Sequence, residues 1–193
     1  MENKEKTILK IYVGGEPCTY ALQIIGIYLN GKYEDKDFGQ LLSSYHYSKE
    51  IVVNQKEYKI VIWNSHSSER FTNFEPYLCK GVRIVIVVYS VEEERTFKFA
   101  KRSLELLKQR VKDCNAKVIL LGVKYAKSTT SEKTYEQAKQ CAQENNIEFR
   151  EITLSQTDEI NKFFTEEVKK MVNSYEEELK PKEEKNKKKC IIF

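Results

Sequence analysis

Two residue types that commonly bind metals or form cross-links are scarce or scattered in this sequence. The chain has two histidines, His46 and His66, and five widely spaced cysteines without a Cys-x-x-Cys pair. Structural zinc sites need about four such ligands at short spacings, and disulfide-rich domains carry an even, closely spaced set of cysteines. We therefore expect reduced cysteines and no metal site built from histidine and cysteine.

Long apolar runs, a signal peptide and a strong charge excess are also missing. The longest apolar run covers residues 84–89, whereas a membrane-spanning helix needs about 20 residues, and residues 1–12 lack the apolar core of a signal peptide. The net charge of +4 is too small to indicate nucleic-acid binding. We expect a cytosolic, monomeric domain with no nucleic-acid partner.

The residues that are present suffice for one folded domain and a tail. A chain of 193 residues buries about 70% of its unfolded surface on folding, and 40% of its residues are hydrophobic. We expect a domain at residues 1–173 and a flexible tail at residues 174–193, in which Pro181 stops the last helical pattern.

Continuous apolar, β-branched runs predict strands that are buried on both faces of a parallel sheet. Two β-rich runs within residues 45–63 flank the polar turn 54–57 and predict an antiparallel hairpin. The other expected strands are residues 8–13, 82–89, 117–123 and 148–152.

Helices are predicted between these strands: one after Gly15, one at residues 90–113, one at residues 131–145 and one from Asp158. Ser90 and Glu93 have the spacing of a capping box, and Glu16 is placed to interact with the dipole of the first helix. The apolar positions that recur every three or four residues in the last three helices are Phe97, Ala100, Leu104, Leu107 and Val111; Tyr135, Ala138 and Ala142; and Ile160, Phe163, Phe164, Val168, Met171 and Val172. This order predicts an α/β fold with about six mostly parallel strands, one antiparallel edge and helices on both faces.

Ligands of such sheets bind beyond the carboxyl ends of the strands. The candidate loops follow Val13, Trp63, Val123 and Ile152. The first loop has the layout of a phosphate-binding loop, GxxxxGK(S/T), which supplies backbone N–H groups, a lysine for the phosphates and a hydroxyl for magnesium. Gly15 opens this pattern, but Tyr20, Ala21 and Leu22 occupy its last three positions.

Three segments of the sequence carry a family resemblance. They are GKY at residues 31–33, IVIWNSHSSERF at residues 60–71 and KGVRIVIVVYSVEEERTF at residues 80–97. With these segments the chain resembles the small GTPases of the Ras superfamily, and among them the Rab branch, over residues 10–171. The resemblance implies a P-loop NTPase-like small GTPase fold, GTP or GDP with magnesium as cofactor, and a role in vesicle and membrane trafficking.

The resemblance also identifies positions where this chain departs from the family. In the first loop, Ala21 stands at the phosphate-binding lysine, Leu22 at the magnesium hydroxyl and Tyr20 at a glycine that lets the phosphates approach. Pro17 removes one N–H group from the same loop.

Later positions on the nucleotide side differ as well. Asn64 stands at the magnesium-side aspartate, Ser67 at the glycine that senses the γ-phosphate and Ser68 at the glutamine that positions the attacking water. No threonine occurs between Tyr20 and Phe71 to serve as the first-switch ligand.

The guanine-reading motif NKxD of the family reads VKYA here. Lys124 is kept, whereas Val123 lacks the amide and Ala126 lacks the carboxylate that pairs with the base. The supporting motif SAK is replaced by residues 153–155, Thr-Leu-Ser.

These losses predict weak nucleotide binding. Hydrogen bonds to charged groups contribute about 1.5–3 kcal/mol each, so three losses reduce affinity on the order of a thousandfold or more. We expect a pseudo-GTPase that is not an enzyme, has no cofactor and acts as a protein-interaction module. The alternative is an atypical GTPase that binds GTP or GDP with magnesium and switches despite its altered motifs.

The resemblance further implies a partner surface. Rab-like proteins recognise effectors through an aromatic triad, which aligns with His46, Trp63 and Leu78. We expect Trp63 and Phe71 to contribute to binding effectors that the sequence does not identify, although Trp63 fits a partly buried core position equally well.

The chain ends in Cys190 followed by Ile, Ile and Phe, a C-a-a-X prenylation motif whose terminal Phe favours a geranylgeranyl group. Four lysines precede it: Lys185, Lys187, Lys188 and Lys189. One lipid chain and a basic segment together give stable anchoring. We expect a prenyltransferase and a prenyl-binding chaperone as partners, and a protein at the cytoplasmic face of a membrane with a cytosolic chaperoned pool. The alternative is a basic, solvated tail that ends in CIIF by chance.

Overall fold

The computed structural model describes residues 6–16, 19–32, 46–65, 81–111, 115–126 and 132–180. Its strands are β1 (Thr7–Gly15), β2 (His46–Val53), β3 (Lys56–Ser65), β4 (Val82–Ser90), β5 (Lys117–Lys124) and β6 (Glu148–Thr153). Its helices are α1 (Ala21–Asn30), α5 (Glu94–Val111), α6 (Glu132–Asn145) and α7 (Thr157–Leu179). None of these described helices is both long and apolar enough to cross a bilayer.

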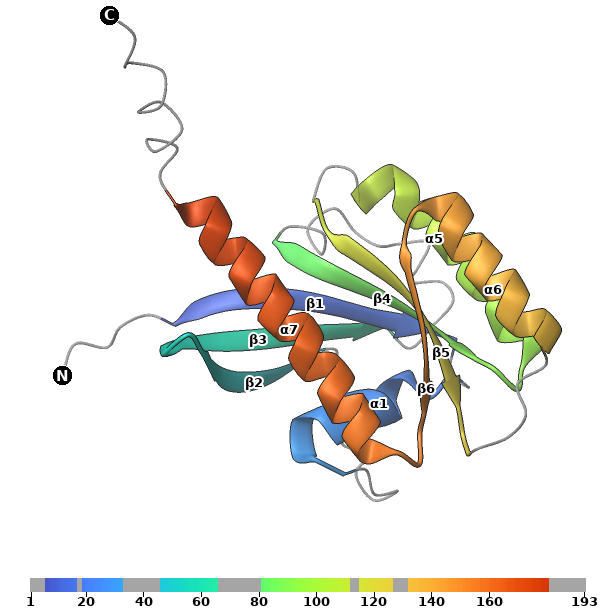
Figure 1. Ribbon diagram of the computed structural model, residues 1–193, viewed down its shortest axis with the longest axis horizontal. Helices are drawn as coiled ribbons and strands as arrows, with labels where there is room; N and C mark the ends of the chain where they lie inside the picture. The colour runs from blue at the N-terminus through green and yellow to red at the C-terminus, as the bar shows by residue number, and fades with distance from the viewer. Residues whose placement is uncertain are drawn as a thin grey trace, which may run out of the picture.

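The strands form one sheet in the order β2-β3-β1-β4-β5-β6. The β2–β3 pair is antiparallel, and β3–β1, β1–β4, β4–β5 and β5–β6 are parallel. Helices α1 and α7 cover one face, and α5 and α6 cover the other (Figure 1). The predicted α/β fold, with about six mostly parallel strands and one antiparallel edge, is therefore confirmed.

The sheet separates two apolar layers, and β4 contributes to both. Ile84, Ile86 and Val88 face the layer under α1 and α7, while Val85 and Val87 face the layer under α5 and α6. A strand with both faces covered needs apolar residues at every covered position, which is why residues 84–89 of β4 form an unbroken apolar run.

The helix faces agree with the predicted periodicity, with one exception. The described apolar positions of α5 and all six apolar positions of α7 are buried, but Tyr135 of α6 is 37% exposed and its ring meets the Phe149 ring edge to face. Tyr135 was therefore wrongly assigned to the buried stripe. The side chain of Val111 lies outside the described residues.

The predicted capping box at the start of α5 does not form. The helix begins at Glu94, and the Ser90 hydroxyl donates to the Glu92 carboxylate at 2.9 Å instead of capping it. The Thr96 hydroxyl accepts a hydrogen bond from the Ser90 N–H at 2.9 Å and donates to the Glu93 carbonyl at 2.7 Å. A buried threonine inside the helix therefore organises this entry.

The predicted hairpin is present, and its turn is shorter than residues 54–57. Asn54 and Gln55 both have positive φ, 51° and 63°, as a two-residue turn between β2 and β3 requires. Lys56 already belongs to β3.

Helix α7 continues to Leu179, so the expected domain boundary at residue 173 falls inside it. Glu176 of this helix accepts hydrogen bonds from Asn54, Lys56 and Tyr58 at 2.7–2.9 Å. Two residues further along α7, Glu178 pairs through both carboxylate oxygens with Arg83 of β4, at 2.8 and 2.9 Å. The Arg83 guanidinium also lies over the Tyr175 ring. These ion pairs hold the polar end of α7 against the sheet.

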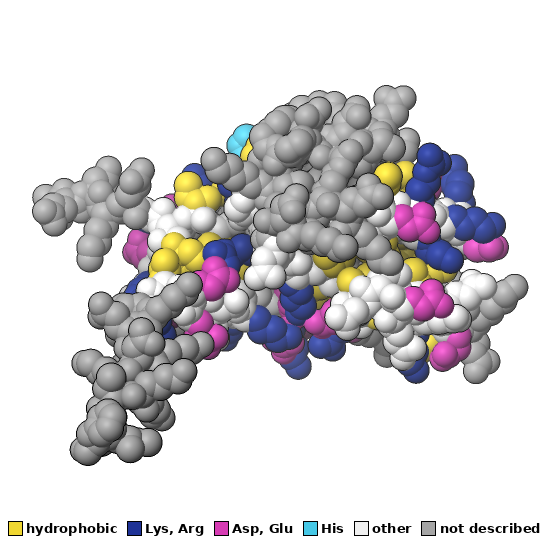
Figure 2. All heavy atoms as spheres, turned by 90° about the horizontal axis from the view of Figure 1, so that it is seen from above, with side chains coloured by type: hydrophobic (Ala, Val, Ile, Leu, Met, Phe, Trp, Pro, Cys, Tyr) yellow, Lys and Arg dark blue, Asp and Glu magenta, His cyan; other side chains and the backbone are white. Residues whose placement is uncertain are grey.

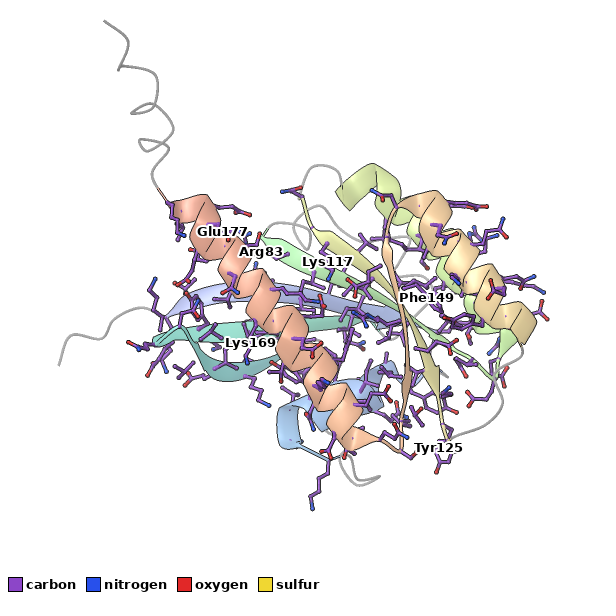
Figure 3. The ribbon with its side chains drawn as sticks, viewed as in Figure 1. Arg83, Lys117, Tyr125, Phe149, Lys169 and Glu177 are labelled. Carbon is purple, nitrogen blue, oxygen red and sulfur yellow. The ribbon has the colours of Figure 1, made fainter. Side chains whose placement is uncertain are left out.

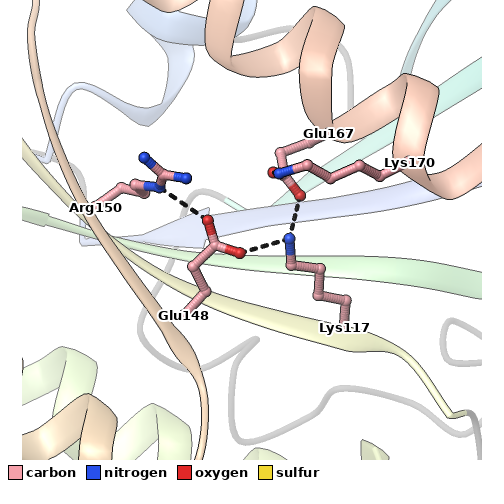
Figure 4. Close-up of polar contacts among 5 residues, drawn as sticks. All are labelled: Lys117, Glu148, Arg150, Glu167 and Lys170. Atoms are coloured by element: carbon pink, nitrogen blue, oxygen red, sulfur yellow. Dashed lines mark hydrogen bonds and ion pairs between the residues drawn. The ribbon is translucent and has the colours of Figure 1, made fainter.

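A buried carboxylate fixes the middle of α7 (Figure 4). Glu167 is 2% exposed and is bound by Lys117 of β5 and by Lys170, the latter at 2.6 Å. Lys117 also pairs with Glu148 at 2.6 Å, and Arg150 pairs with Glu148 at 2.8 Å. Burial opposes the ionisation of Glu148, but hydrogen bonds from Lys117 and Arg150 outweigh it and lower the pKa of Glu148.

Removing the buried carboxylate is expected to destabilise the domain. Glu167→Ala leaves two lysines without their shared acceptor, which costs about 3 kcal/mol of unfolding free energy. Glu166→Ala removes an exposed carboxylate one residue earlier and is the matched control. Urea denaturation measures both, and a Glu167→Ala variant as stable as Glu166→Ala would contradict the role given to this network.

The contact of Glu176 predicts a pH dependence of stability. Hydrogen bonds from Lys56, Asn54 and Tyr58 lower the pKa of Glu176 from 4.5 to about 2. A lowered folded-state pKa gives stability that is present above pH 4.5 and is lost as the pH falls toward 2. The stability lead of the wild type over Glu176→Gln should therefore shrink over this interval.

Chemical denaturation at a series of pH values tests this expectation. Glu177→Gln changes an exposed carboxylate on the same helix turn and should show no such interval. Parallel curves for wild type and Glu176→Gln between pH 5 and 2 would show that the Glu176 contact does not contribute in solution.

Candidate functional site

Strands β1, β3, β5 and β6 all end at the carboxyl edge of the sheet. Val13 pairs with Asn64 across β1 and β3, and Lys124 pairs with Thr153 across β5 and β6. Tyr125, at the end of β5, lies at the same end of the molecule as the β6–α7 connection, whereas Glu177 lies near the opposite end of α7 (Figure 3). This edge is where ligands of open α/β sheets bind.

The loop after β1 turns sharply on itself. Both the N–H and the hydroxyl of Thr19 donate to the Glu16 carbonyl, at 3.0 and 2.7 Å. A Cβ atom at Gly15 would lie 2.4 Å from the Thr19 hydroxyl and 2.6 Å from the Val88 carbonyl. The loop can therefore pack in this way only with glycine at position 15.

The three substituted positions of this loop lie where α1 begins. Tyr20 is the residue before the helix and has a left-handed backbone, with φ 62° and ψ 16°. Ala21 and Leu22 are 8% and 7% exposed and belong to the apolar layer under α1 and α7. Neither side chain can supply a charge or a hydroxyl to a ligand.

Asn64 lies at the end of β3 beside this loop. Its amide N–H donates to the Val13 carbonyl at 2.8 Å, and the side chain is buried. Its carbonyl oxygen Oδ1 is buried and has no donor among the described residues. A buried acceptor without a partner is costly, and a ligand-bound or metal-bound water would satisfy it.

Glu16 does not serve the first helix as expected. Helix α1 begins five positions later and has no acidic residue in its first turn. The Glu16 carboxylate instead lies 3.5 Å from the Arg95 guanidinium of α5. The interaction of Glu16 with the helix dipole was therefore wrongly predicted.

The second loop of the site follows β5 and is held by neighbouring loops. The Leu154 N–H donates to the Lys124 carbonyl at 2.7 Å, and the Ser155 N–H donates to the Tyr125 carbonyl at 3.3 Å. Glu92 accepts a hydrogen bond from the Tyr125 N–H at 2.8 Å. The structure thus brings the predicted motifs at 123–126 and 153–155 together.

An open, mostly parallel sheet of this kind occurs in many unrelated protein families. A family model described as the Ras family matches residues 13–173.

The chain belongs to the Ras family.

This Ras-family chain is similar to several Rab-named proteins at low identity. It is 24% identical over 172 residues to Ras-related protein Rab-5A of Dictyostelium discoideum, which covers 89% of the chain and 85% of that protein. It is 29% identical to Ras-related protein SEC4 of Saccharomyces cerevisiae over 60% of the chain and 53% of that protein. It is 27% identical to Ypt/Rab-type GTPase ypt7 of Schizosaccharomyces pombe over 50% of the chain and 47% of that protein. The last two matches span about half the length of those relatives.

Two expectations from the sequence are wrong in the light of these matches. We expected a chain that is not an enzyme and that has no cofactor. The Ras-family match and the Rab-named relatives, one of them named a GTPase, instead indicate a GTPase, which is a hydrolase, with GTP or GDP and magnesium as its cofactor. Counting lost side-chain ligands underestimated a fold that also binds phosphates through backbone N–H groups.

The residues of this Ras-family chain fit such a ligand in part. Gly15 allows the tight loop, Asn64 offers a buried acceptor and Lys124 stands at the end of β5. Ala21 and Leu22 contribute only apolar surface to the core. The main chain and Asn64 would therefore carry more of the binding than in relatives with a lysine at this position.

Of the expected effector surface, two members lie together. His46 and Trp63 are opposite residues of β2 and β3, with ring centroids 5.3 Å apart. Trp63 is half-buried against the layer under α5 and α6, and His46 is exposed.

Seen from above, the described part of the surface shows interleaved basic and acidic side chains (Figure 2).

Several predicted residues of this Ras-family chain lie outside the part that the structure describes. They are Ser68, Phe71, Leu78, Lys185, Lys187, Lys188, Lys189 and Cys190. Sequence reasoning also missed Tyr125 and Glu92 at the described site. The exposed aromatic inside VKYA was the available signal for Tyr125, whereas the contact of Glu92 follows only from the fold.

Proposed function

We propose that this chain is a lipid-anchored, Rab-like switch that binds guanine nucleotide with magnesium and recruits partner proteins to the cytoplasmic face of a membrane in vesicle trafficking. The family match and the Rab-named relatives support this proposal. The observation that carries the nucleotide part is the buried Oδ1 oxygen of Asn64, which has no donor among the described residues and lies beside a loop closed at Gly15.

Nucleotide binding would depend on a different division of contacts from the family pattern. Backbone N–H groups at the start of α1 favour phosphate, because the dipole of a helix is positive at its N-terminus. The Asn64 oxygen suits a magnesium-bound water, since Mg²⁺ prefers oxygen ligands and keeps several waters. A missing charged contact costs about 1.5–3 kcal/mol, so affinity should be lower than with a lysine at position 21.

The anchor would be the C-terminal segment. Cys190 would carry the prenyl group, and the four lysines at 185 and 187–189 would add about 1 kcal/mol each near an anionic leaflet. A prenyltransferase and a prenyl-binding chaperone would serve this modification and maintain a cytosolic pool. The folded unit would extend to Leu179, because α7 is held to the sheet up to Glu178.

Partners would be recognised on the β2–β3 side of the sheet. The His46–Trp63 pair offers an exposed ring beside a half-buried one, and aromatic residues are enriched in protein interfaces. Phe71 would belong to the same surface by resemblance. The effectors themselves are not identified by this chemistry.

Nucleotide titration tests the first part of the proposal. The wild-type chain should bind Mg-GDP, and Ala21→Lys combined with Leu22→Ser should lower the Kd about 10- to 100-fold, because a charged phosphate contact and a metal-binding hydroxyl are added. Isothermal calorimetry of the full chain measures this.

Ser174→Lys is the control, since it adds the same charge on an exposed position of α7. It should leave the Kd as in wild type. If neither wild type nor the double variant gained thermal stability from Mg-GDP, the nucleotide part of the proposal would be refuted.

Membrane partition tests the second part. The prenylated full chain should bind vesicles that contain anionic phospholipid, and Cys190→Ser should abolish this binding because the lysines alone give weak, salt-sensitive attraction. Sedimentation with vesicles at two salt concentrations measures it. Equal sedimentation of Cys190→Ser and wild type would rule out the lipid anchor.

A further inference from the structure

Two tyrosine rings meet across the carboxyl edge of the sheet. Tyr20 ends the loop after β1 and Tyr125 follows β5, and their ring centroids are 6.2 Å apart with planes inclined by 40°. Strands β1 and β5 are separated only by β4, so the two loops start about 10 Å apart. A nucleoside can bridge such a separation, with its phosphate at one loop and its base at the other.

Tyr125 presents an open ring on a fixed backbone. Its N–H donates to one carboxylate oxygen of Glu92 at 2.8 Å, and the Ser90 hydroxyl donates to the other at 2.9 Å. Its carbonyl accepts from the Ser155 N–H at 3.3 Å. The residue is nevertheless 64% exposed, so the main chain is held from two sides while ring surface remains accessible (Figure 3).

Tyr20 is positioned by the core. Its ring is half-buried and packs against the layer under α1 and α7, to which Leu154 also packs. Its carbonyl accepts the first hydrogen bond of α1 from the Ile24 N–H at 3.0 Å. The Tyr20 ring therefore has a fixed position, from which it packs against the Tyr125 ring.

Two side chains of the loop after β5 cannot read a base edge. Val123 is fully buried, and Ala126 ends in a methyl group, so neither side chain can form a hydrogen bond with a base edge. Stacking on an aromatic ring tolerates any base, because every base has a π face.

We infer that Tyr125, supported by Tyr20, holds the purine of the bound nucleotide by stacking, and that the site discriminates little between guanine and adenine. This inference rests on the proposed nucleotide binding and concerns which bases the site accepts. In the family pattern a carboxylate at position 126 holds the base by hydrogen bonds. Here Ala126 cannot do so, and stacking on Tyr125 would hold the base instead.

Competition binding on the full chain tests the inference. Fluorescent N-methylanthraniloyl-GDP is displaced with Mg-GDP or Mg-ADP, and the two Kd values should agree within about threefold. Tyr125→Ala should raise the Kd of both nucleotides to the same extent, by about 5- to 150-fold, which is the effect of losing one base–aromatic stack. Tyr125→Phe should retain most of the affinity that Tyr125→Ala loses.

Tyr135→Ala is the matched control, because Tyr135 is an exposed tyrosine of α6 whose ring contacts Phe149. It should bind both nucleotides as the wild type does. A preference for GDP above about thirtyfold, or a Tyr125→Ala variant that binds like Tyr135→Ala, would overturn the inference and leave the proposed function standing. No displacement and no direct binding of any nucleotide would overturn both.

Discussion

The loop after β1 depends on the absence of a side chain at Gly15. The Thr19 hydroxyl and the Val88 carbonyl both occupy space that a Cβ atom would need, and Val88 is backbone of the central strand β4. The turn at Glu16 and Thr19 can close only because this space is open. Everything beyond the turn follows from it: the start of α1, the burial of Ala21 and Leu22, and the position of the Tyr20 ring.

Helix α7 connects this edge of the sheet with its opposite end through charges rather than apolar contacts alone. Near its middle, Glu167 is held in the core by two lysines, and near its end Glu176 and Glu178 reach the β2–β3 turn and β4. A buried carboxylate without partners would destabilise the helix, so these contacts determine where α7 can lie. The end of α7 at Leu179 is therefore fixed beside the β2–β3 turn and β4.

The sequence allowed the sheet and the helix faces to be predicted because burial on both faces requires unbroken apolar runs and burial on one face requires a helical period. It did not reveal features that depend on distant contacts. The Ser90 hydroxyl binds Glu92 instead of capping α5, and α7 passes residue 173 because its acidic end meets Lys56 and Arg83. The positions of Ala21 and Asn64 came from the family resemblance, whereas the meeting of Tyr20 and Tyr125 required the strand order. The error about the cofactor arose from giving the lost side-chain ligands more weight than the backbone N–H groups that the loop keeps.

Tyr20 has a left-handed backbone conformation that glycine adopts more easily, so its ring must contribute stability that glycine would not. A left-handed backbone costs a residue other than glycine about 1–2 kcal/mol, so this position carries strain. Half-burying a tyrosine ring removes on the order of 100 Å² from water, which contributes about 2.5 kcal/mol. Burial of the ring against the layer under α1 and α7 can thus offset the strain, and in this position the ring also meets the Tyr125 ring. The same packing that makes tyrosine tolerable at this position places it at the edge where a nucleotide base would bind.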